Sequence, residues 1–259
     1  MNPEMRESLA NVLLCLADDE LILGHRDSEW CGHAPILEED IAFANIALDE
    51  LGHASLWYQE VAQLRDQAPM ASTDAAYLDE LVFFREPAEF RCLPLVELPR
   101  GDWAFSIMRQ YLYDAAELIR MEAISNRAYP PAAEIARKIY KEEIYHHRHT
   151  RAWVERLGLG TSESQRRLQN ALDALWPYAN QIFEPLPDEE ALVQAKVLPE
   201  STSLHVLWLQ EVVDFLSACE LKIPESSTLS ENRMNHSAHL AVLLREMQSV
   251  ARMDRQATW

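Results

Sequence analysis

The sequence predicts an all-α protein built around a four-helix bundle with additional C-terminal helices. Glycine is scarce, at 6 of 259 residues, and the helix-favouring residues Ala, Leu, Glu, Gln, Arg and Met are abundant. Over long segments, apolar residues recur every three or four positions, as on the buried face of an amphipathic helix. The motif Glu-x-x-His occurs twice in such segments, at Glu50 to His53 and at Glu143 to His146. The alternation of β-branched and aromatic residues that is typical of strands is missing.

The first helix is expected over residues 4–24. Its apolar stripe is interrupted by Glu20, which belongs to an acidic cluster with Asp18 and Asp19. Glu20 is either a charge near the helix end that faces solvent or a carboxylate that points into the core. It precedes Glu50 by 30 residues, which is enough for two antiparallel helices to bring both carboxylates to one level. This spacing favours the second interpretation.

The second helix is expected over residues 35–63, because Pro35 follows a turn marked by Gly32 and is suited to a first helical position. Glu50 and His53 fall in its apolar stripe. A buried carboxylate is costly unless it is paired or coordinated, so this pair is hard to explain without a cation. The stripe comprises Ile46, Ala47, Glu50, His53, Ala54, Trp57 and Val61.

The third long helix is expected over residues 102–126, with Asp102 as its N-cap. Before it we expect a loop at 64–73, a short helix at 74–84 and an irregular segment at 86–99. Asp114 and Glu117 both lie on the apolar side of the third helix and precede Glu143 by 29 and 26 residues. Residue type favours Glu117 as the inward carboxylate and spacing favours Asp114, so both remain candidates.

The fourth long helix is expected over residues 130–157, opened by two prolines, with Glu143 and His146 in its apolar stripe. Glu142, His147 and His149 are out of phase with that stripe. We therefore expect them at the surface or behind the inward-pointing residues. Three further helices are expected at 162–183, 203–221 and 232–253. We therefore expect one domain over residues 1–259, with a bundle core at about 4–158 and accessory helices at about 162–253.

Composition limits the class of protein. The formal net charge is −19, from 42 acidic and 23 basic residues, which argues against a nucleic-acid-binding surface or binding to anionic membranes. The N-terminal residues do not form a signal peptide or a membrane span. The four cysteines are scattered and form no Cys-x-x-Cys pair, so we expect reduced thiols in a cytoplasmic protein.

Two Glu-x-x-His pairs, each with one carboxylate from a preceding helix, are the ligand set of a dinuclear carboxylate centre in a four-helix bundle. Glu50 and Glu143 would bridge two metal ions, while Asp49 or Glu142 would orient the imidazoles. Iron and manganese both accept this mixture of carboxylate and imidazole. No phosphate loop, nucleophile motif or dinucleotide fingerprint is present, so electrons would come from a separate protein. The predicted ligands are Glu20, Glu50, His53, Asp114 or Glu117, Glu143 and His146.

Several blocks of the sequence resemble the C subunits of the bacterial phenylacetyl-CoA ring 1,2-epoxidases. The blocks lie at residues 29–35, 44–49, 109–114, 142–146 and 153–158, and in the C-terminal stretch from His236 to Trp259. The resemblance implies a ferritin-like subunit of a multicomponent oxygenase of phenylacetate degradation. It implies pairing with a catalytic A subunit, which carries the di-iron site and binds the CoA thioester. It also implies a separate reductase that draws electrons from NADPH, and phenylacetyl-CoA as substrate of the complex.

The resemblance also implies that C subunits serve as scaffolds and have lost most metal ligands, whereas this sequence retains the whole set. Three interpretations stay open: a subunit with its own di-iron centre, a structural scaffold with a vestigial site, and a stand-alone di-iron oxidase of the rubrerythrin type. A substrate slot, if present, would be lined by Ile46, Trp57, Tyr111 and Ile139. A local basic patch is a candidate for phosphate contacts, although such runs are commonly solvated helix faces: Arg137, Lys138, Lys141, Arg148 and Arg151.

Overall fold

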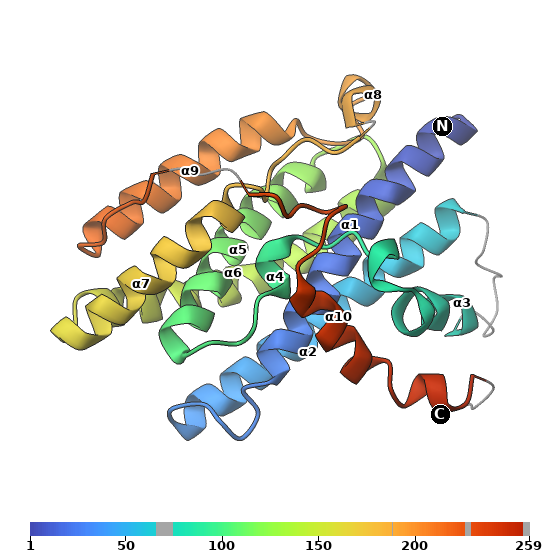
Figure 1. Cartoon of the computed structure of the whole chain (residues 1–259). Coiled ribbons are helices and arrows are strands. Elements are labelled where there is room, and N and C mark those ends of the chain that lie inside the picture. Colours follow the sequence, from blue (N-terminus) through green and yellow to red (C-terminus); the bar gives the residue numbers. More distant parts are fainter. Residues whose placement is uncertain (66–74, 188, 226–228, 256–259) are drawn as a thin grey trace.

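The computed structural model describes residues 1–65, 75–187, 189–225 and 229–255, and all regular secondary structure in these ranges is helical. Four long helices form the bundle: α1 (Pro3–Ser28), α2 (Leu37–Leu64), α5 (Trp103–Ser125) and α6 (Pro130–Gly158). α1 packs along α2 and α5 packs along α6, and the two pairs meet where α2 lies beside α6 (Figure 1). The predicted all-α fold and its four long helices are confirmed.

The helix starts follow the local sequence. The side chain of Asn2 caps α1 by accepting a hydrogen bond from the Met5 amide at 2.8 Å, and Asp102 caps α5 through the Phe105 amide at 3.0 Å. The predicted start of the second helix at Pro35 is wrong by two residues. Residues before Leu37 stay in a turn because Gly32 adopts a positive φ of 76° and its amide donates to the Asp40 carboxylate at 2.7 Å.

The connection between α2 and α5 is built from short pieces. Residues 66–73 of the predicted loop lie outside the described part of the chain. The predicted short helix is present as α3 (Ala75–Asp79) and a π-helical turn, η1 (Glu80–Phe84). The segment expected to be irregular contains two single turns, η2 (Pro87–Glu89) and α4 (Pro94–Glu97), each opened by a proline.

The C-terminal helices are α7 (Ser162–Ala179), α8 (Glu189–Gln194), α9 (Ser201–Ala218) and α10 (Ala238–Met247), followed by η3 (Ala251–Met253). α7 packs against α5 and α6, and α9 packs against α5. α8 was not predicted, because six residues are too few to establish a helical period. The division into a bundle core and accessory helices within one domain remains a prediction.

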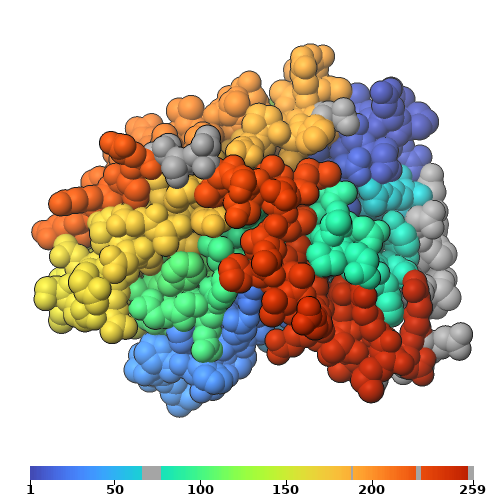
Figure 2. All heavy atoms as spheres, viewed as in Figure 1, coloured from blue at the N-terminus to red at the C-terminus, as the bar shows by residue number. Residues whose placement is uncertain are grey.

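The predicted helix at residues 232–253 is wrong at its start, because α10 begins only at Ala238. Residues 229–236 are not helical and cross the bundle before α10, and the space-filling view shows the C-terminal segment lying across the middle of this face (Figures 1 and 2). In this non-helical conformation Arg233 and His236 bind the buried carboxylates of Asp19 on α1 and Glu97 on α4. Tertiary contacts therefore override the local helical pattern here.

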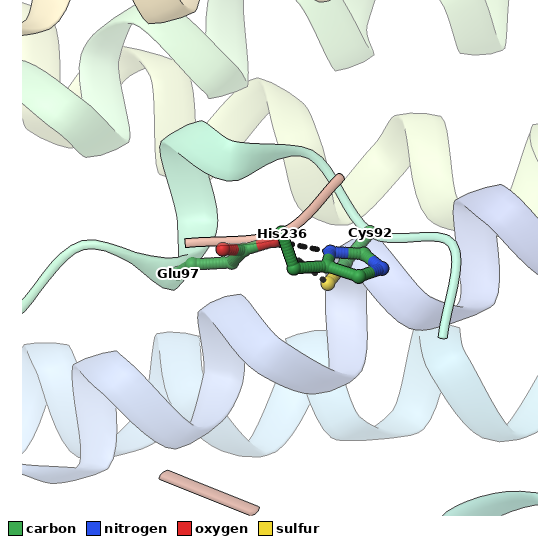
Figure 3. Close-up of side chains that lie close together, drawn as sticks. All are labelled: Cys92, Glu97 and His236. Atoms are coloured by element: carbon green, nitrogen blue, oxygen red, sulfur yellow. Dashed lines mark hydrogen bonds and ion pairs between the residues drawn. The ribbon is translucent and has the colours of Figure 1, made fainter. Parts of the chain in front are cut away.

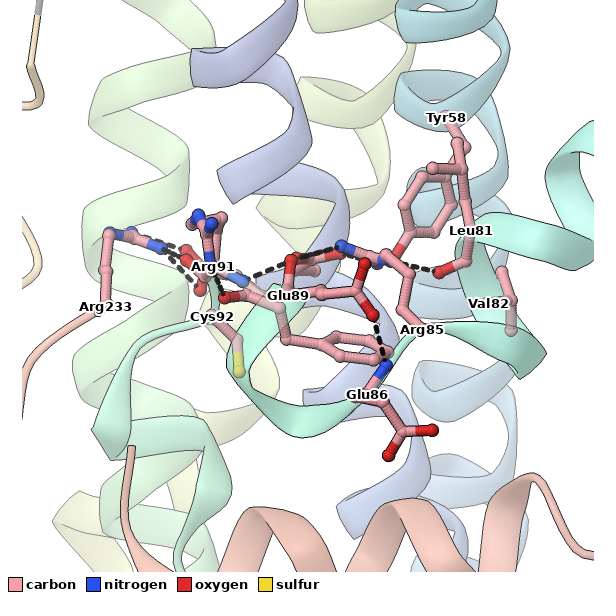
Figure 4. A network of polar contacts seen from close by, with 12 residues as sticks. Tyr58, Leu81, Val82, Arg85, Glu86, Glu89, Arg91, Cys92 and Arg233 are labelled. Atoms are coloured by element: carbon pink, nitrogen blue, oxygen red, sulfur yellow. Dashed lines mark hydrogen bonds and ion pairs between the residues drawn. The ribbon is translucent and has the colours of Figure 1, made fainter. Parts of the chain in front are cut away.

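The acidic cluster on α1 is buried rather than solvated. Asp19 forms a two-pronged ion pair with Arg233, at 2.9 and 2.7 Å, and also accepts the Leu93 amide at 2.7 Å. Asp18 binds Arg85, the Arg91 amide and the Tyr58 hydroxyl, which donates at 2.6 Å (Figure 4). Neither carboxylate is exposed to solvent. These contacts fasten the connection after α2 and the C-terminal segment to the bundle.

The four cysteines differ sharply in accessibility: Cys31 is exposed, and Cys15, Cys92 and Cys219 are buried. Burial also raises the pKa of Cys15 to about 11, which disfavours its reactive thiolate. We therefore expect a thiol reagent such as DTNB to modify one cysteine per chain in the native protein and four after denaturation. Rapid reaction of two or more thiols in the native protein would contradict the buried positions.

Candidate metal centre

The structure brings all the predicted ligand residues into the interior of the bundle. Glu20 comes from α1, Glu50 and His53 from α2, and Glu143 and His146 from α6. α5 contributes both candidate carboxylates, Asp114 and Glu117. His53 is 1% exposed and the other six are 0% exposed. The inward position that the helical period predicted for these side chains is therefore confirmed.

The five predicted ligands from α1, α2 and α6 face one another around a shared space. The Nδ1 atom of His53 lies 3.6 Å from Glu20, 3.7 Å from Glu50 and 3.6 Å from Glu143. The Nδ1 atom of His146 lies 3.2 Å from Glu143 and 3.6 Å from Glu50. Glu50 directs Oε2 towards His53 and Oε1 towards His146, and Oε1 of Glu143 faces both rings. This is the arrangement expected of carboxylates that bridge two cations.

Unpaired polar atoms show that this space suits cations. Both carboxylate oxygens of Glu20, Oε2 of Glu50, Oε2 of Glu143 and Nδ1 of His53 are buried without a hydrogen-bond partner among the described residues. Leaving such groups unpaired costs free energy, which cation binding recovers. The ligand atoms form two groups, Glu20–Glu50–His53 and Glu50–Glu143–His146, which share Glu50. Within each group the atoms lie within 4.8 Å of one another. The residues fit a pair of divalent metal ions.

The outer nitrogen of each imidazole is held by a carboxylate from the facing helix. Nε2 of His53 lies 2.7 Å from Glu142 on α6, and Nε2 of His146 lies 3.2 Å from Asp49 on α2. A carboxylate at Nε2 fixes the ring orientation and leaves Nδ1 available to a metal. The predicted role of Asp49 and Glu142 behind the imidazoles is consistent with these contacts.

His147 and His149 lie away from the shared space, as predicted. His147 contacts Glu211 of α9 at 3.2 Å, and His149 contacts Glu39 of α2 at 3.0 Å. Because they face other helices, neither ring contributes to the two groups of ligand atoms.

The two candidate carboxylates of α5 have different surroundings. Asp114 accepts hydrogen bonds from Gln110 and from Thr150 of α6, both at 2.8 Å. The Gln110 amide also donates to Oε1 of Glu50 at 2.9 Å, so it links Asp114 to the centre. Glu117 instead forms an ion pair with Arg120. Sequence reasoning missed Gln110, and the only signal was an amide residue one helical turn before Asp114.

The electrostatics of the centre are dominated by burial and by crowded carboxylates. Burial and the charge of Glu50 raise the pKa of Glu20 well above its usual range. Burial also acts to raise the pKa of Glu50, but the nearby Glu20 and His53 outweigh it and lower that pKa to about 2. For His53, burial acts to lower the pKa, and Glu50 and Glu143 outweigh it, so the pKa is about 9. Protons therefore neutralise part of the negative charge, and cation binding would release them.

A glycine brings the first two helices together at this level. A Cβ atom added to Gly24 would lie 3.1 Å from the Ala47 carbonyl oxygen and 3.1 Å from the Cβ atom of Glu50. Gly24 therefore allows α1 to approach α2 closely beside Glu50. This packing places Glu20, one turn earlier on α1, against Glu50.

A second cluster of ligand-type residues lies outside the bundle centre and differs from it. His236 contacts Glu97 at 2.6 Å through Nδ1 (Figure 3). Its Nε2 contacts the Phe90 carbonyl at 2.9 Å, and the Ser237 amide donates to the other oxygen of Glu97 at 2.7 Å. Cys92 lies 3.7 Å from Glu97. Since Glu97 and His236 are fully paired, this cluster fastens the C-terminal segment without needing a cation.

Comparisons with known proteins show the family of the chain. A family model described as "Phenylacetic acid catabolic protein" matches residues 1–259. The chain belongs to this family. It is 34% identical over 248 residues to the C subunit of 1,2-phenylacetyl-CoA epoxidase from Escherichia coli (strain K12), covering 95% of this chain and 97% of that protein. It is 23% identical over 172 residues to the A subunit of the epoxidase from the same organism, covering 66% of this chain and 52% of that protein.

The resemblance inferred from the sequence blocks is thus confirmed, and membership of the phenylacetic acid catabolic protein family extends over the whole chain. Trp259, the last residue of the C-terminal block, lies outside the described part of the structure. Among the described residues, no helix combines the length and apolar character required to cross a membrane.

Proposed function

We propose that this chain is the C-type subunit of a cytoplasmic, multicomponent oxygenase that epoxidises the ring of phenylacetyl-CoA, and that it pairs with an A-type catalytic subunit. The main support is that the match to an epoxidase C subunit extends over nearly the whole length of both chains. The weaker similarity to the A subunit fits a pair of related proteins. A separate reductase would supply electrons, because the sequence carries no dinucleotide fingerprint.

We further propose that this chain holds its own dinuclear metal centre, with iron as the metal and manganese as the alternative. Glu50 and Glu143 would bridge, His53 and His146 would each bind one metal, and Glu20 would be a terminal ligand. Bound iron would supply the reduction of dioxygen. The unpaired buried oxygens of Glu20, Glu50 and Glu143 support this proposal. The chain itself would orient the imidazoles through Asp49 and Glu142 and exclude bulk water from the ligands.

Asp114 is the favoured carboxylate from α5. Burial and the charges of Glu143 and Glu50 raise its pKa well above the usual range, while His146 opposes them. Its hydrogen-bond donors, an amide and a hydroxyl, are neutral. Glu117 pairs through Oε1 with Arg120, whose positive charge opposes a cation at that oxygen, while its Oε2 is buried without a hydrogen-bond partner among the described residues.

A matched pair of substitutions separates the two carboxylates. We expect Asp114→Asn to reduce metal affinity by at least about tenfold, because a metal would bind Asp114 as the deprotonated carboxylate, which asparagine cannot supply. Glu117→Gln is expected to leave metal content within about twofold of the unmodified chain. The measurement is elemental analysis after reconstitution with ferrous iron. The reverse result would assign the ligand to Glu117.

The proposed function is tested by reconstitution with an A-type subunit, the reductase, NADPH and phenylacetyl-CoA, with mass spectrometry of the product. We expect the ring epoxide to form only when this chain is present. Full turnover with a metal-stripped chain would support a purely structural role and remove the proposed centre from catalysis. Peroxide or iron oxidation by this chain alone, without the A-type subunit, would instead favour a stand-alone oxidase.

A further inference from the structure

The solvent side of α2 carries an unusual stripe, here called the uncharged stripe. Seven exposed residues follow one another at helical spacing over a length of about 33 Å, and none of them is charged. The outer face of a surface helix is normally its charged face, yet here it includes Leu37, Ile41 and Leu48, which are 71%, 56% and 67% exposed. The uncharged stripe consists of Leu37, Ile41, Asn45, Leu48, Gly52, Ser55 and Gln59.

Gly52 occupies the middle of this stripe, and the fold of the chain does not require a glycine there. It lies inside a regular helix, where glycine is less favourable than alanine, and an added Cβ atom would meet nothing within 4 Å. Gly24, by contrast, is packed against Glu50 and Ala47. A missing side chain on an exposed helix face lets another backbone approach closely. Gly52 therefore leaves room for the backbone of another chain to approach α2 closely.

A row of residues on α6 lies across the seam between α2 and α6 from the uncharged stripe. Ile144 and Tyr145 are 47% and 52% exposed, and exposed cations surround them on the outer side of the helix. These cations, which are most of the basic patch noted in the sequence, stand out in a chain with a net charge of −19. The basic row consists of Arg137, Lys138, Lys141, Ile144, Tyr145 and Arg148.

The seam between α2 and α6 leads directly to the metal centre. Asp49 is the residue after Leu48 of the stripe, and it contacts His146. Glu142 is the residue after Lys141 of the row, and it contacts His53. The side chains of these two carboxylates remain 42% and 38% exposed. A protein bound over the seam would bury them and shield the outer ends of both imidazoles from water.

We propose that the uncharged stripe and the basic row together form the docking face for the A-type subunit, with Gly52 where the two chains approach most closely. This inference rests on the pairing proposed above. The row carries four exposed cations, whereas the exposed acids within one turn of the row or the stripe are Glu134 on α6 and Glu38 on α2. An acidic counterpart would complement this excess of positive charge, and an isologous contact would bring the same cations together. The carboxylates at the seam, Asp49 and Glu142, are already held by imidazoles. The charge pattern therefore fits a different chain with an acidic docking face better than a second copy.

The test measures binding of the full-length chain to an immobilised A-type subunit by surface plasmon resonance. Gly52→Leu places a bulky side chain at the centre of the docking face, and we expect the Kd to rise at least about 30-fold. The matched control is Leu207→Arg, at a residue that is 55% exposed on α9, and it is expected to leave the Kd within about twofold. Because Gly52 has free space around it, Gly52→Leu should fold with an unchanged or raised Tm.

Each outcome bears on a distinct claim. If the unmodified chain binds and Gly52→Leu binds equally well, the docking face is wrong while the pairing stands. If the unmodified chain does not bind the A-type subunit, the pairing fails and the docking proposal fails with it. If the chain alone is a dimer that Gly52→Leu converts to a monomer, the occupant of this face is a second copy. Charge reversal through Lys141→Glu is expected to weaken binding most at low salt.

Discussion

Replacement of Glu50 by alanine is expected to lower the affinity of the chain for ferrous iron by more than about 100-fold, a larger loss than residues behind the ligands usually cause. Glu50 is the residue shared by both groups of ligand atoms, and its two oxygens face His53 and His146 separately. Its loss therefore affects both metal positions. The measurement is iron content after reconstitution, by elemental analysis, with calorimetric titration for the affinity.

A suitable control lies on the same helix. Glu60 is also buried and accepts a hydrogen bond from the Tyr129 hydroxyl at 2.5 Å, but it is not part of the ligand groups. Glu60→Ala should retain full iron content. Without metal, Glu50→Ala should be less stable than the unmodified chain, because the fold favours ionised Glu50 and its removal leaves His53 and the Gln110 amide without this partner. Full iron content in Glu50→Ala would refute the proposed centre.

Replacement of Arg233 by methionine is expected to lower the free energy of unfolding by about 3–5 kcal/mol, because it leaves the charge of Asp19 buried without its partner. The pair is two-pronged, and Asp19 is 0% exposed. The same pair fastens residues 229–236 to α1. For a chain of this size the midpoint of thermal unfolding should fall by roughly 10 °C. Differential scanning calorimetry or thermal circular dichroism measures the change.

Arg255→Met provides the comparison for that experiment. Arg255 pairs with Glu80 at the surface, where both side chains are largely exposed and an ion pair contributes less than about 1 kcal/mol. The shift for Arg255→Met should therefore be within about 3 °C. If the two variants unfolded at the same temperature, the Arg233–Asp19 pair would not hold the C-terminal segment as described.

Local spacing in the sequence was sufficient to predict the bundle and most of the candidate centre. The period of apolar residues located the four long helices to within a few residues, because amphipathic helices bury one continuous stripe. Glu50, His53, Glu143 and His146 were found because they interrupt such a stripe at i and i+3, which places each pair on one helix face. Glu20 followed from its distance along the chain to Glu50. These features depend on residues within one helix or one hairpin.

Other features were decided by contacts between segments that are far apart in the chain. The burial of Asp18 and Asp19 could not be predicted from local spacing, because their partners, Arg85 and Arg233, come 67 and 214 residues later. The late start of α10 has the same cause, since it depends on where Arg233 and His236 bind. Likewise, the helical pattern left Asp114 and Glu117 equivalent. The packing of α5 against α6 distinguishes them, because it brings the Thr150 hydroxyl to Asp114, while Glu117 pairs with Arg120 of its own helix.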